Sequence, residues 1–89
     1  MSDDQQTLFE FPCRFPIKAM GRADGDFETL VVEIVRRHAP DLGEAAVTVR
    51  ESRGGKWVSV TVVVEARSKD QLDAIYRDLS AHERVVWAL

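Results

Sequence analysis

The 89-residue sequence has little of what marks secreted, membrane-spanning or nucleic-acid-binding proteins. Its single cysteine, Cys13, excludes an internal disulfide. No apolar run approaches the roughly 20 residues that span a bilayer, and residues 1–6 are polar and acidic, unlike a signal peptide. The formal net charge is -3, without the basic surplus typical of proteins that bind nucleic acid. We therefore expect a cytoplasmic protein without membrane contact or specific affinity for nucleic acid.

The most regular pattern is the stretch 57–66, in which valines recur at every second position. A period of two with many β-branched residues is typical of a strand and unfavourable in a helix. The side of the strand that carries Val58, Val60, Val62 and Val64 needs an apolar cover. A strand this long and apolar belongs in the middle of a sheet, because an exposed edge would promote aggregation.

The remaining elements follow from periodicity and from turn and capping residues. We expect strands at 15–22, 46–52 and 83–89, and helices at 26–38 and from Ser68 onward, where Ser68 and Gln71 have the spacing of a capping box. This order predicts an α+β, ferredoxin-like βαββαβ fold with a four-stranded antiparallel sheet in the order 4-1-3-2 and both helices on one face. We expect residues 1–7 to be a disordered tail and 8–89 to form a single ferredoxin-like domain.

The alternation also assigns side chains to the two faces of the sheet. Val47 and Val49 should point inward, and Val85, Trp87 and Leu89 should share one face, with Trp87 in the core or at its rim. The face left uncovered by the helices is mixed in polarity, which suits reversible contact. The candidate binding face comprises Lys18, Met20, Thr48, Arg50, Trp57, Ser59, Thr61 and Val63.

Residues able to carry catalysis or bind a metal are few and scattered. The two histidines, His38 and His82, should lie at opposite ends of the fold, so they cannot share a metal ion. Cys13 has no partner in a nucleophile signature, and Ser59 and Thr61 lack a candidate base. We therefore expect no catalytic residues, no metal, no cofactor and no enzymatic activity.

A basic hairpin leaves nucleic-acid binding open as an alternative. Arg50, Arg53 and Lys56 lie around the turn that precedes the valine strand, and RNA-recognition domains share the expected topology. Those domains stack bases on aromatic side chains of the central strands. Here Trp57 is the only aromatic residue expected on that face, and it lies at the margin. An RNA-binding module is therefore the alternative function that the sequence leaves open.

Three motifs resemble the YbeD-like family of small bacterial proteins over residues 8–89. They are Phe9-Glu10-Phe11-Pro12-x-x-Phe15-x-x-Lys18-x-Met20-Gly21, Val32-x-x-Val35-x-x-His38-Ala39-Pro40, and Tyr76-x-x-Leu79. The resemblance implies a ferredoxin-like fold similar to ACT-type regulatory domains, and it implies no mechanism. ACT domains bind small effectors near a glycine between the first strand and first helix, usually at a dimer interface, and Gly25 stands in a comparable place.

The motifs themselves should come together at one end of the domain. We expect a structural clasp in which Phe9 and Phe11 are substantially buried near Ala39 and Pro40, because large apolar residues outside regular elements are otherwise a liability. The full cluster of motif residues comprises Phe9, Phe11, Pro12, Phe15, His38, Ala39 and Pro40.

Taken together, the sequence favours a small non-enzymatic regulatory or binding domain. We expect it to contact a protein or a small effector through the uncovered sheet face or through an edge strand. We expect a monomer or a weak homodimer.

Overall fold

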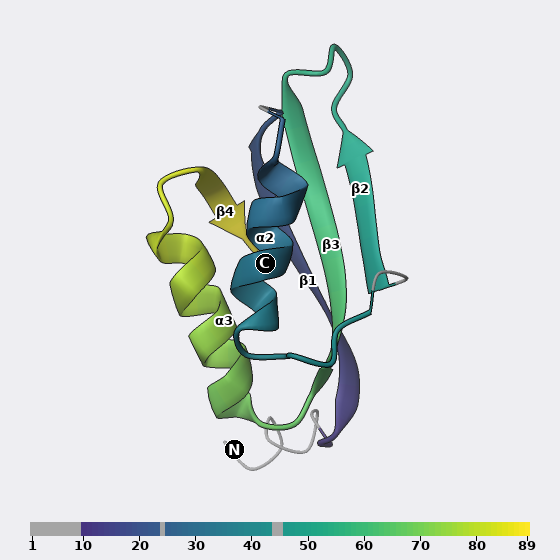
Figure 1. Ribbon diagram of the computed structural model, residues 1–89, viewed down its shortest axis with the longest axis vertical. Helices are drawn as coiled ribbons and strands as arrows, with labels where there is room; N and C mark the ends of the chain where they lie inside the picture. The colour runs from purple at the N-terminus through teal and green to yellow at the C-terminus, as the bar shows by residue number, and fades with distance from the viewer. Residues whose placement is uncertain (1–9, 24, 44–45) are drawn as a thin grey trace, which may run out of the picture.

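The computed structural model describes residues 10–23, 25–43 and 46–89. The elements in chain order are β1 (Cys13–Arg22), α2 (Phe27–Arg36), β2 (Val47–Glu51), β3 (Trp57–Ala66), α3 (Lys69–Ala81) and β4 (Val85–Ala88). The strands form one antiparallel sheet in the order β2-β3-β1-β4, and both helices lie on one face of it (Figure 1). The expected ferredoxin-like α+β fold is confirmed.

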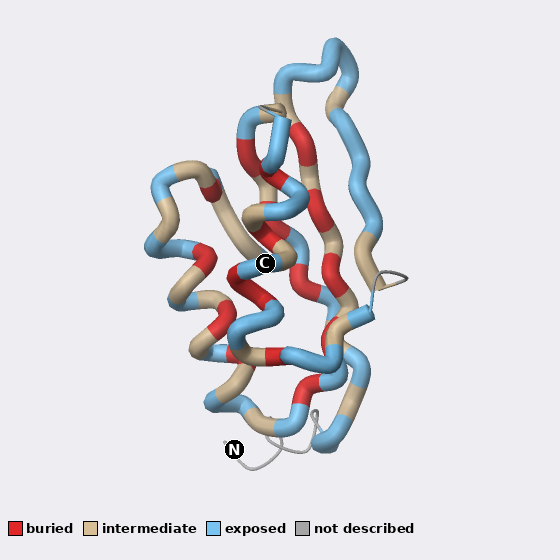
Figure 2. The backbone as a smooth tube through the Cα atoms, in the orientation of Figure 1, coloured by how far each residue is buried: buried red, intermediate tan, exposed pale blue. Residues whose placement is uncertain are grey.

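The two central strands, β1 and β3, pair without interruption along their whole length. Their register runs from Cys13 opposite Ala66 to Arg22 opposite Trp57. Every second residue of β3 is buried, and Val60 and Val62 have no exposed surface at all. Figure 2 shows this alternation as a red-and-tan pattern along β3. The valine pattern in the sequence therefore identified the core side of the sheet correctly.

Each helix covers that valine side with one apolar stripe. In α2 the buried residues are Phe27, Val31, Ile34 and Val35, spaced by three or four as an amphipathic helix requires. In α3 they are Leu72, Ile75 and Leu79. The Oγ atom of Ser68 accepts a hydrogen bond from the backbone N–H of Gln71 at 3.1 Å, so the expected helix cap is confirmed.

The edge strand β2 is less buried than its sequence pattern predicts. Val47 is half-buried against the core, and Val49 lies opposite Val60, so both point to the helix side as expected, but Val49 is 42% exposed. The helices pack on β1, β3 and β4, and the outer part of β2 extends beyond α2 (Figure 1). Alternation predicts which way a side chain points, whereas burial also needs an element above it.

The strand β4 contains a bulge that the sequence analysis did not anticipate. Val85 lies opposite Gly21, but Trp87 lies opposite Met20, so Val86 is an extra residue that is 56% exposed. The expectation that Val85, Trp87 and Leu89 share one face is therefore wrong. Val85 stays in the core, while Trp87 points with Met20 to the uncovered side of the sheet.

The N-terminal clasp is only partly within the described residues. Phe9 and the expected tail at 1–7 lie outside them. Phe11 is 36% exposed, so the expectation of a substantially buried side chain is wrong for this residue. Phe15 is half-buried and packs against the core. No helix in the described part of the chain is long and apolar enough to cross a membrane.

Candidate functional site

The sheet face opposite the helices is a continuous surface that no described element covers. We call it the open face. The registers of β1 with β3 and β4, and of β2 with β3, place its members on the same side. Its members are Arg14, Pro16, Lys18, Met20, Arg22, Thr48, Arg50, Trp57, Ser59, Thr61, Val63, Glu65, Trp87 and Leu89.

Each candidate residue named from the sequence lies on this face. One row crosses all four strands as Arg50, Ser59, Met20 and Trp87. A second row crosses them as Thr48, Thr61, Lys18 and Leu89, whose backbone exchanges hydrogen bonds of 2.9 and 2.7 Å with Lys18. Val63 lies one row further along β3. Lys18, Thr48 and Arg50 are exposed, and Met20, Ser59, Thr61 and Val63 are half-buried.

Both tryptophans of the chain lie at one end of the open face. Trp57 is opposite Arg22, whose guanidinium carbon is 5.8 Å from the centroid of a Trp57 ring, within range of a cation–π contact. Trp87 is opposite Met20, which separates it from β3. Both rings are half-buried, so each presents apolar surface to solvent. We call Met20, Arg22, Trp57 and Trp87 the aromatic end.

Trp87 is not among the residues that the sequence pattern places on this face, although one signal for its position exists. A glycine inside a strand pattern often marks a bulge or a close backbone approach. The pairing of β1 with β4 shifts between Met20 and Gly21. A Cβ atom at Gly21 would lie 2.6 Å from the backbone oxygen of Arg84 and would collide with the ring of Phe27. The glycine thus lets β4 approach closely where the bulge reorients Trp87.

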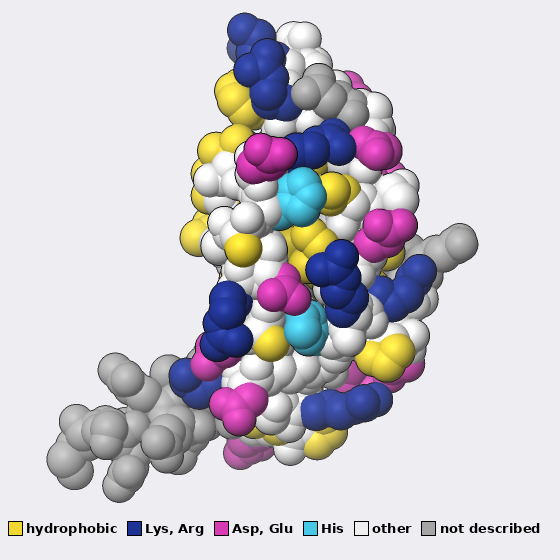
Figure 3. Space-filling model, turned by 60° about the vertical axis from the view of Figure 1, so that its left-hand side comes forward, with side chains coloured by type: hydrophobic (Ala, Val, Ile, Leu, Met, Phe, Trp, Pro, Cys, Tyr) yellow, Lys and Arg dark blue, Asp and Glu magenta, His cyan; other side chains and the backbone are white. Residues whose placement is uncertain are grey.

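The open face differs in charge from the rest of the chain. It carries four basic residues, Arg14, Lys18, Arg22 and Arg50, and one acidic residue, Glu65, although the whole chain has a formal net charge of -3. Among the described residues, Lys18, Arg22 and Arg50 form no ion pair. The described ion pairs lie instead among the helices and loops, and Figure 3 shows acidic and basic side chains interspersed on the side that it presents.

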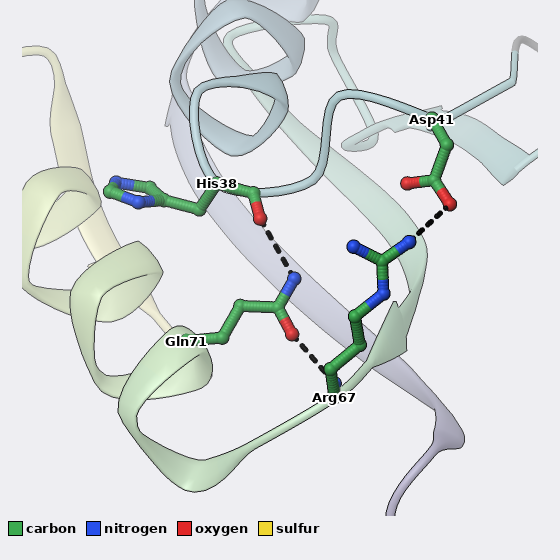
Figure 4. A network of polar contacts seen from close by, with 4 residues as sticks. All are labelled: His38, Asp41, Arg67 and Gln71. Carbon is green, nitrogen blue, oxygen red and sulfur yellow. Dashed lines mark hydrogen bonds and ion pairs between the residues drawn. The ribbon is translucent and has the colours of Figure 1, made fainter.

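The family motif His38-Ala39-Pro40 lies in the loop after α2. Polar contacts hold this loop against the start of α3 (Figure 4). The side-chain amide of Gln71 donates to the backbone oxygen of His38 at 2.8 Å, and its oxygen accepts from the N–H of Arg67 at 2.6 Å. Arg67 also donates to Asp41 at 3.0 Å. The arrangement holds two chain segments together and offers no nucleophile.

The His38 side chain has a second partner on α3. Its Nε2 atom lies 2.7 Å from Oδ2 of Asp78. This hydrogen bond, reinforced by the charges of the neighbouring Arg37 and Arg77, holds the pKa of the Asp78 carboxyl below its usual value of 3.8. The next residue in the chain, Ala39, is buried in the core, whereas Pro40 is exposed.

Metal-binding and nucleophilic side chains do not converge within residues 10–23, 25–43 and 46–89. No group of three or more histidine, cysteine or acidic side chains there could hold a metal ion. His82 accepts a hydrogen bond from the backbone N–H of Arg84 at its Nδ1 atom, and Cys13 is a half-buried free thiol. On the opposite side of the fold from the open face, Arg84 pairs with Asp26 at 2.7 Å and lowers the pKa of that carboxyl.

The glycine singled out by the ACT-like resemblance borders a small hollow. Gly25 has a φ of 75°, which favours glycine, and it is exposed at the turn before α2. The hollow, between that turn and β2, has a volume of about 260 Å³ and includes Glu28, Val49 and Glu51 in its lining. Ligand pockets are usually about 300–1,000 Å³, so this hollow is small for an effector.

Comparison with known proteins gives a family and no activity. The family model described as "Protein of unknown function (DUF493)" matches residues 6–89. A UPF0250 protein of Chromobacterium violaceum is 53% identical over 89 residues, covering 100% of both chains. UPF0250 proteins of Ectopseudomonas mendocina and Neisseria gonorrhoeae are 48% and 45% identical and cover 94% and 93% of this chain and 92% and 91% of their own. The resemblance to a small bacterial family is confirmed, and the chain belongs to the DUF493 family.

Proposed function

We propose that this chain is a non-catalytic binding domain that docks a protein partner through the open face. The observation that carries the proposal is the aromatic end: two tryptophans, a methionine and an arginine lie together on an uncovered sheet face. Tryptophan and arginine are the residue types that most often dominate binding energy at protein interfaces, and methionine is enriched there too.

The chemistry of the open face supports binding over catalysis. Its hydroxyl groups belong to Thr48, Ser59 and Thr61, and the Ser59 hydroxyl donates to the backbone oxygen of Arg50 at 3.5 Å. In the register, Thr48 and Thr61 lie opposite each other, and the other residues opposite Ser59 and Thr61 are Arg50, Lys18 and Met20, so no histidine or carboxylate lies opposite these hydroxyls. A hydrolytic nucleophile needs a base within hydrogen-bond reach, so these hydroxyls are unsuited to that task.

A regulatory role of the ACT type would use a different surface, the hollow beside Gly25. Its volume of about 260 Å³ is below the usual size of ligand pockets, and its titratable lining residues are the acidic Glu28 and Glu51. RNA binding would use the open face itself, to which Trp87 adds a second ring. We rank it second because aliphatic and hydroxyl side chains occupy the middle of the face, where stacking platforms are required.

The proposal can be tested with one substitution placed on either side of the sheet. Thr61→Lys puts a long charged side chain in the middle of the open face. Thr29→Lys makes the same change at an exposed position of helix α2. The immobilised wild type and both variants are exposed to a bacterial lysate, and bound proteins are quantified by mass spectrometry.

The expected result is a partner retained by the wild type and by Thr29→Lys but lost with Thr61→Lys. The captured protein is then purified and titrated against all three chains. Equal affinity of the purified protein for Thr61→Lys and the wild type would contradict docking on this face.

A further inference from the structure

We infer that the open face recognises an acidic protein segment that carries a large apolar side chain close to a carboxylate. The inference rests on the proposed function, and it specifies the chemistry of the partner. Three observations support it: the excess of positive charge on the face, the lack of ion pairs for Lys18, Arg22 and Arg50 among the described residues, and the position of these three residues in or next to the aromatic end.

The charge on the open face is unusual for this chain. Four of its side chains are basic and one is acidic, whereas the sequence as a whole has three more acidic than basic residues. An acidic partner would be attracted to this face and repelled by the remaining surface, which orients the encounter. A basic partner would experience the opposite preference.

The basic residues Lys18 and Arg50 of the face are accessible for pairing with a partner's carboxylates. On the other side of the sheet, Arg67, Lys69 and Arg84 each pair with an aspartate at 3.1 Å or less. Among the described residues, Lys18 and Arg50 are exposed and have no such carboxylate. A partner's carboxylates could supply charge-assisted hydrogen bonds there without first breaking an ion pair.

The spacing of the face relates charge to apolar contact. Lys18 and Met20 are two residues apart on β1 and point the same way, so their attachment points are about 7 Å apart. An extended peptide also presents residues i and i+2 on one side at about this spacing. A segment with an acidic residue two positions from a Trp, Phe, Leu or Ile could therefore contact Lys18 while its apolar side chain reaches the aromatic end.

The same observations favour a protein segment over RNA. Affinity for nucleic acid depends largely on phosphate neutralisation, and a net charge of -3 on the chain weakens that attraction. Among the described residues of the face, the aromatic side chains are Trp57 and Trp87, and Met20, Thr61 and Val63 provide aliphatic surface beside them. Aliphatic contact suits apolar side chains better than flat bases.

The test uses a displayed library of random 12-residue peptides as the probe. The selections use the wild type, the variant Lys18→Glu/Arg50→Glu and the control Arg37→Glu/Arg77→Glu. The control changes two exposed basic residues outside the open face, so the two variants have the same net charge. Circular dichroism and melting temperatures establish that all three chains are folded.

We expect peptides selected by the wild type and by the control to be enriched in Asp or Glu two positions from a large apolar residue. Lys18→Glu/Arg50→Glu should bind these peptides at least tenfold more weakly and should select no acidic enrichment. Trp57→Ala/Trp87→Ala should lose the peptides altogether.

Other outcomes separate the inference from the proposed function. Peptides without acidic enrichment that still require Thr61 would overturn the acidic partner and leave docking on the open face intact. Peptides that bind Thr61→Lys as well as the wild type would overturn both. If a 12-nucleotide single-stranded RNA binds more tightly than any selected peptide, the occupant of the face is RNA and the acidic segment is overturned. If sedimentation shows a dimer that buries the tryptophans, the occupant is a second copy of the chain, and the acidic segment is again overturned.

Discussion

The two faces of the sheet are built from the same strands but impose different demands on the sequence. On the side covered by helices, alternate residues of β3 are valines, all nearly or fully buried. On the open face the same strand presents Trp57, Ser59, Thr61, Val63 and Glu65, of which four are half-buried. Side chains on the covered face must be apolar and must fit the helices above them, whereas side chains on the open face can vary without loss of the core. Function is therefore best sought on the open face.

The largest expected difference in the free energy of unfolding is between two valine-to-glutamate variants at adjacent positions of β3. Val62→Glu would put a carboxylate where no surface is exposed, and burial of an unpaired charge costs several kcal/mol. Val63→Glu points to the open face and should change the free energy of unfolding by no more than about 1 kcal/mol. Urea denaturation followed by circular dichroism measures both. Similar losses in the two variants would show that both faces are buried.

A second substitution tests the close approach behind the bulge. Gly21→Ala adds a Cβ atom 2.6 Å from the backbone oxygen of Arg84, so β4 or Phe27 must move. Overpacking of this kind typically destabilises by about 1–3 kcal/mol. Gly43→Ala is the control, because a Cβ atom there meets nothing within 4 Å. If the two variants unfold at the same urea concentration, β4 does not approach Gly21 in the way described.

Deletion of Val86 tests the bulge itself. Val85 and Trp87 lie opposite the consecutive residues Gly21 and Met20, so removal of Val86 leaves both on their present faces. We expect a change in the free energy of unfolding of about 1 kcal/mol or less, with the Trp87 emission still that of a partly exposed ring. In a strand without a bulge, the deletion would instead turn Trp87 to the other face and cause a much larger loss.

The smallest expected effect concerns the contact between His38 and Asp78 on the covered side. Because His38 lowers the pKa of Asp78, the folded state holds this carboxylate in its charged form more strongly than the unfolded chain does. The resulting stability is present above pH 3.8 and is lost as the pH falls below it. Asp78→Asn should therefore show a shallower decline in stability below pH 3.8 than the wild type. His38→Gln should give the same shallow decline, and a wild-type slope in either variant would contradict the pairing.

Comparison of the two faces also explains how much the sequence could predict. The strands, the helix stripes and the strand order follow from alternation, from the 3.6-residue period and from the serine cap at Ser68. Each of these signals lies within one segment of the chain, and burial in the core requires the same pattern of apolar residues. The covered side was therefore predictable almost residue by residue.

What the sequence could not predict depends on contacts between distant segments. The bulge at Val86 arises where β4 meets Gly21, and the exposure of Val49 depends on how far α2 extends over β2. The pairing of His38 with Asp78 joins residues 40 positions apart. Periodicity contains none of this information, so Trp87 was missed, whereas alternation placed Met20, Arg22 and Trp57 on the correct side.

The most direct test of the account is the quenching of tryptophan fluorescence by ions of opposite charge. The chain has two tryptophans, both assigned to the open face, and the single-tryptophan variants Trp57→Phe and Trp87→Phe report on each separately. One net unit charge about 10 Å away in water changes local ion concentration roughly twofold at low salt. A positive charge enriches iodide and depletes caesium by this factor, so iodide should quench both rings about fourfold more efficiently than caesium, each compared with its quenching of free tryptophan.

This preference should disappear or reverse in Lys18→Glu/Arg50→Glu and remain in Arg37→Glu/Arg77→Glu. Such a result would place both rings on a solvent-exposed, positively charged face. A Trp87 that neither ion quenches, or equal quenching by iodide and caesium in the wild type, would contradict the central claim that the open face is an accessible, positively charged docking surface.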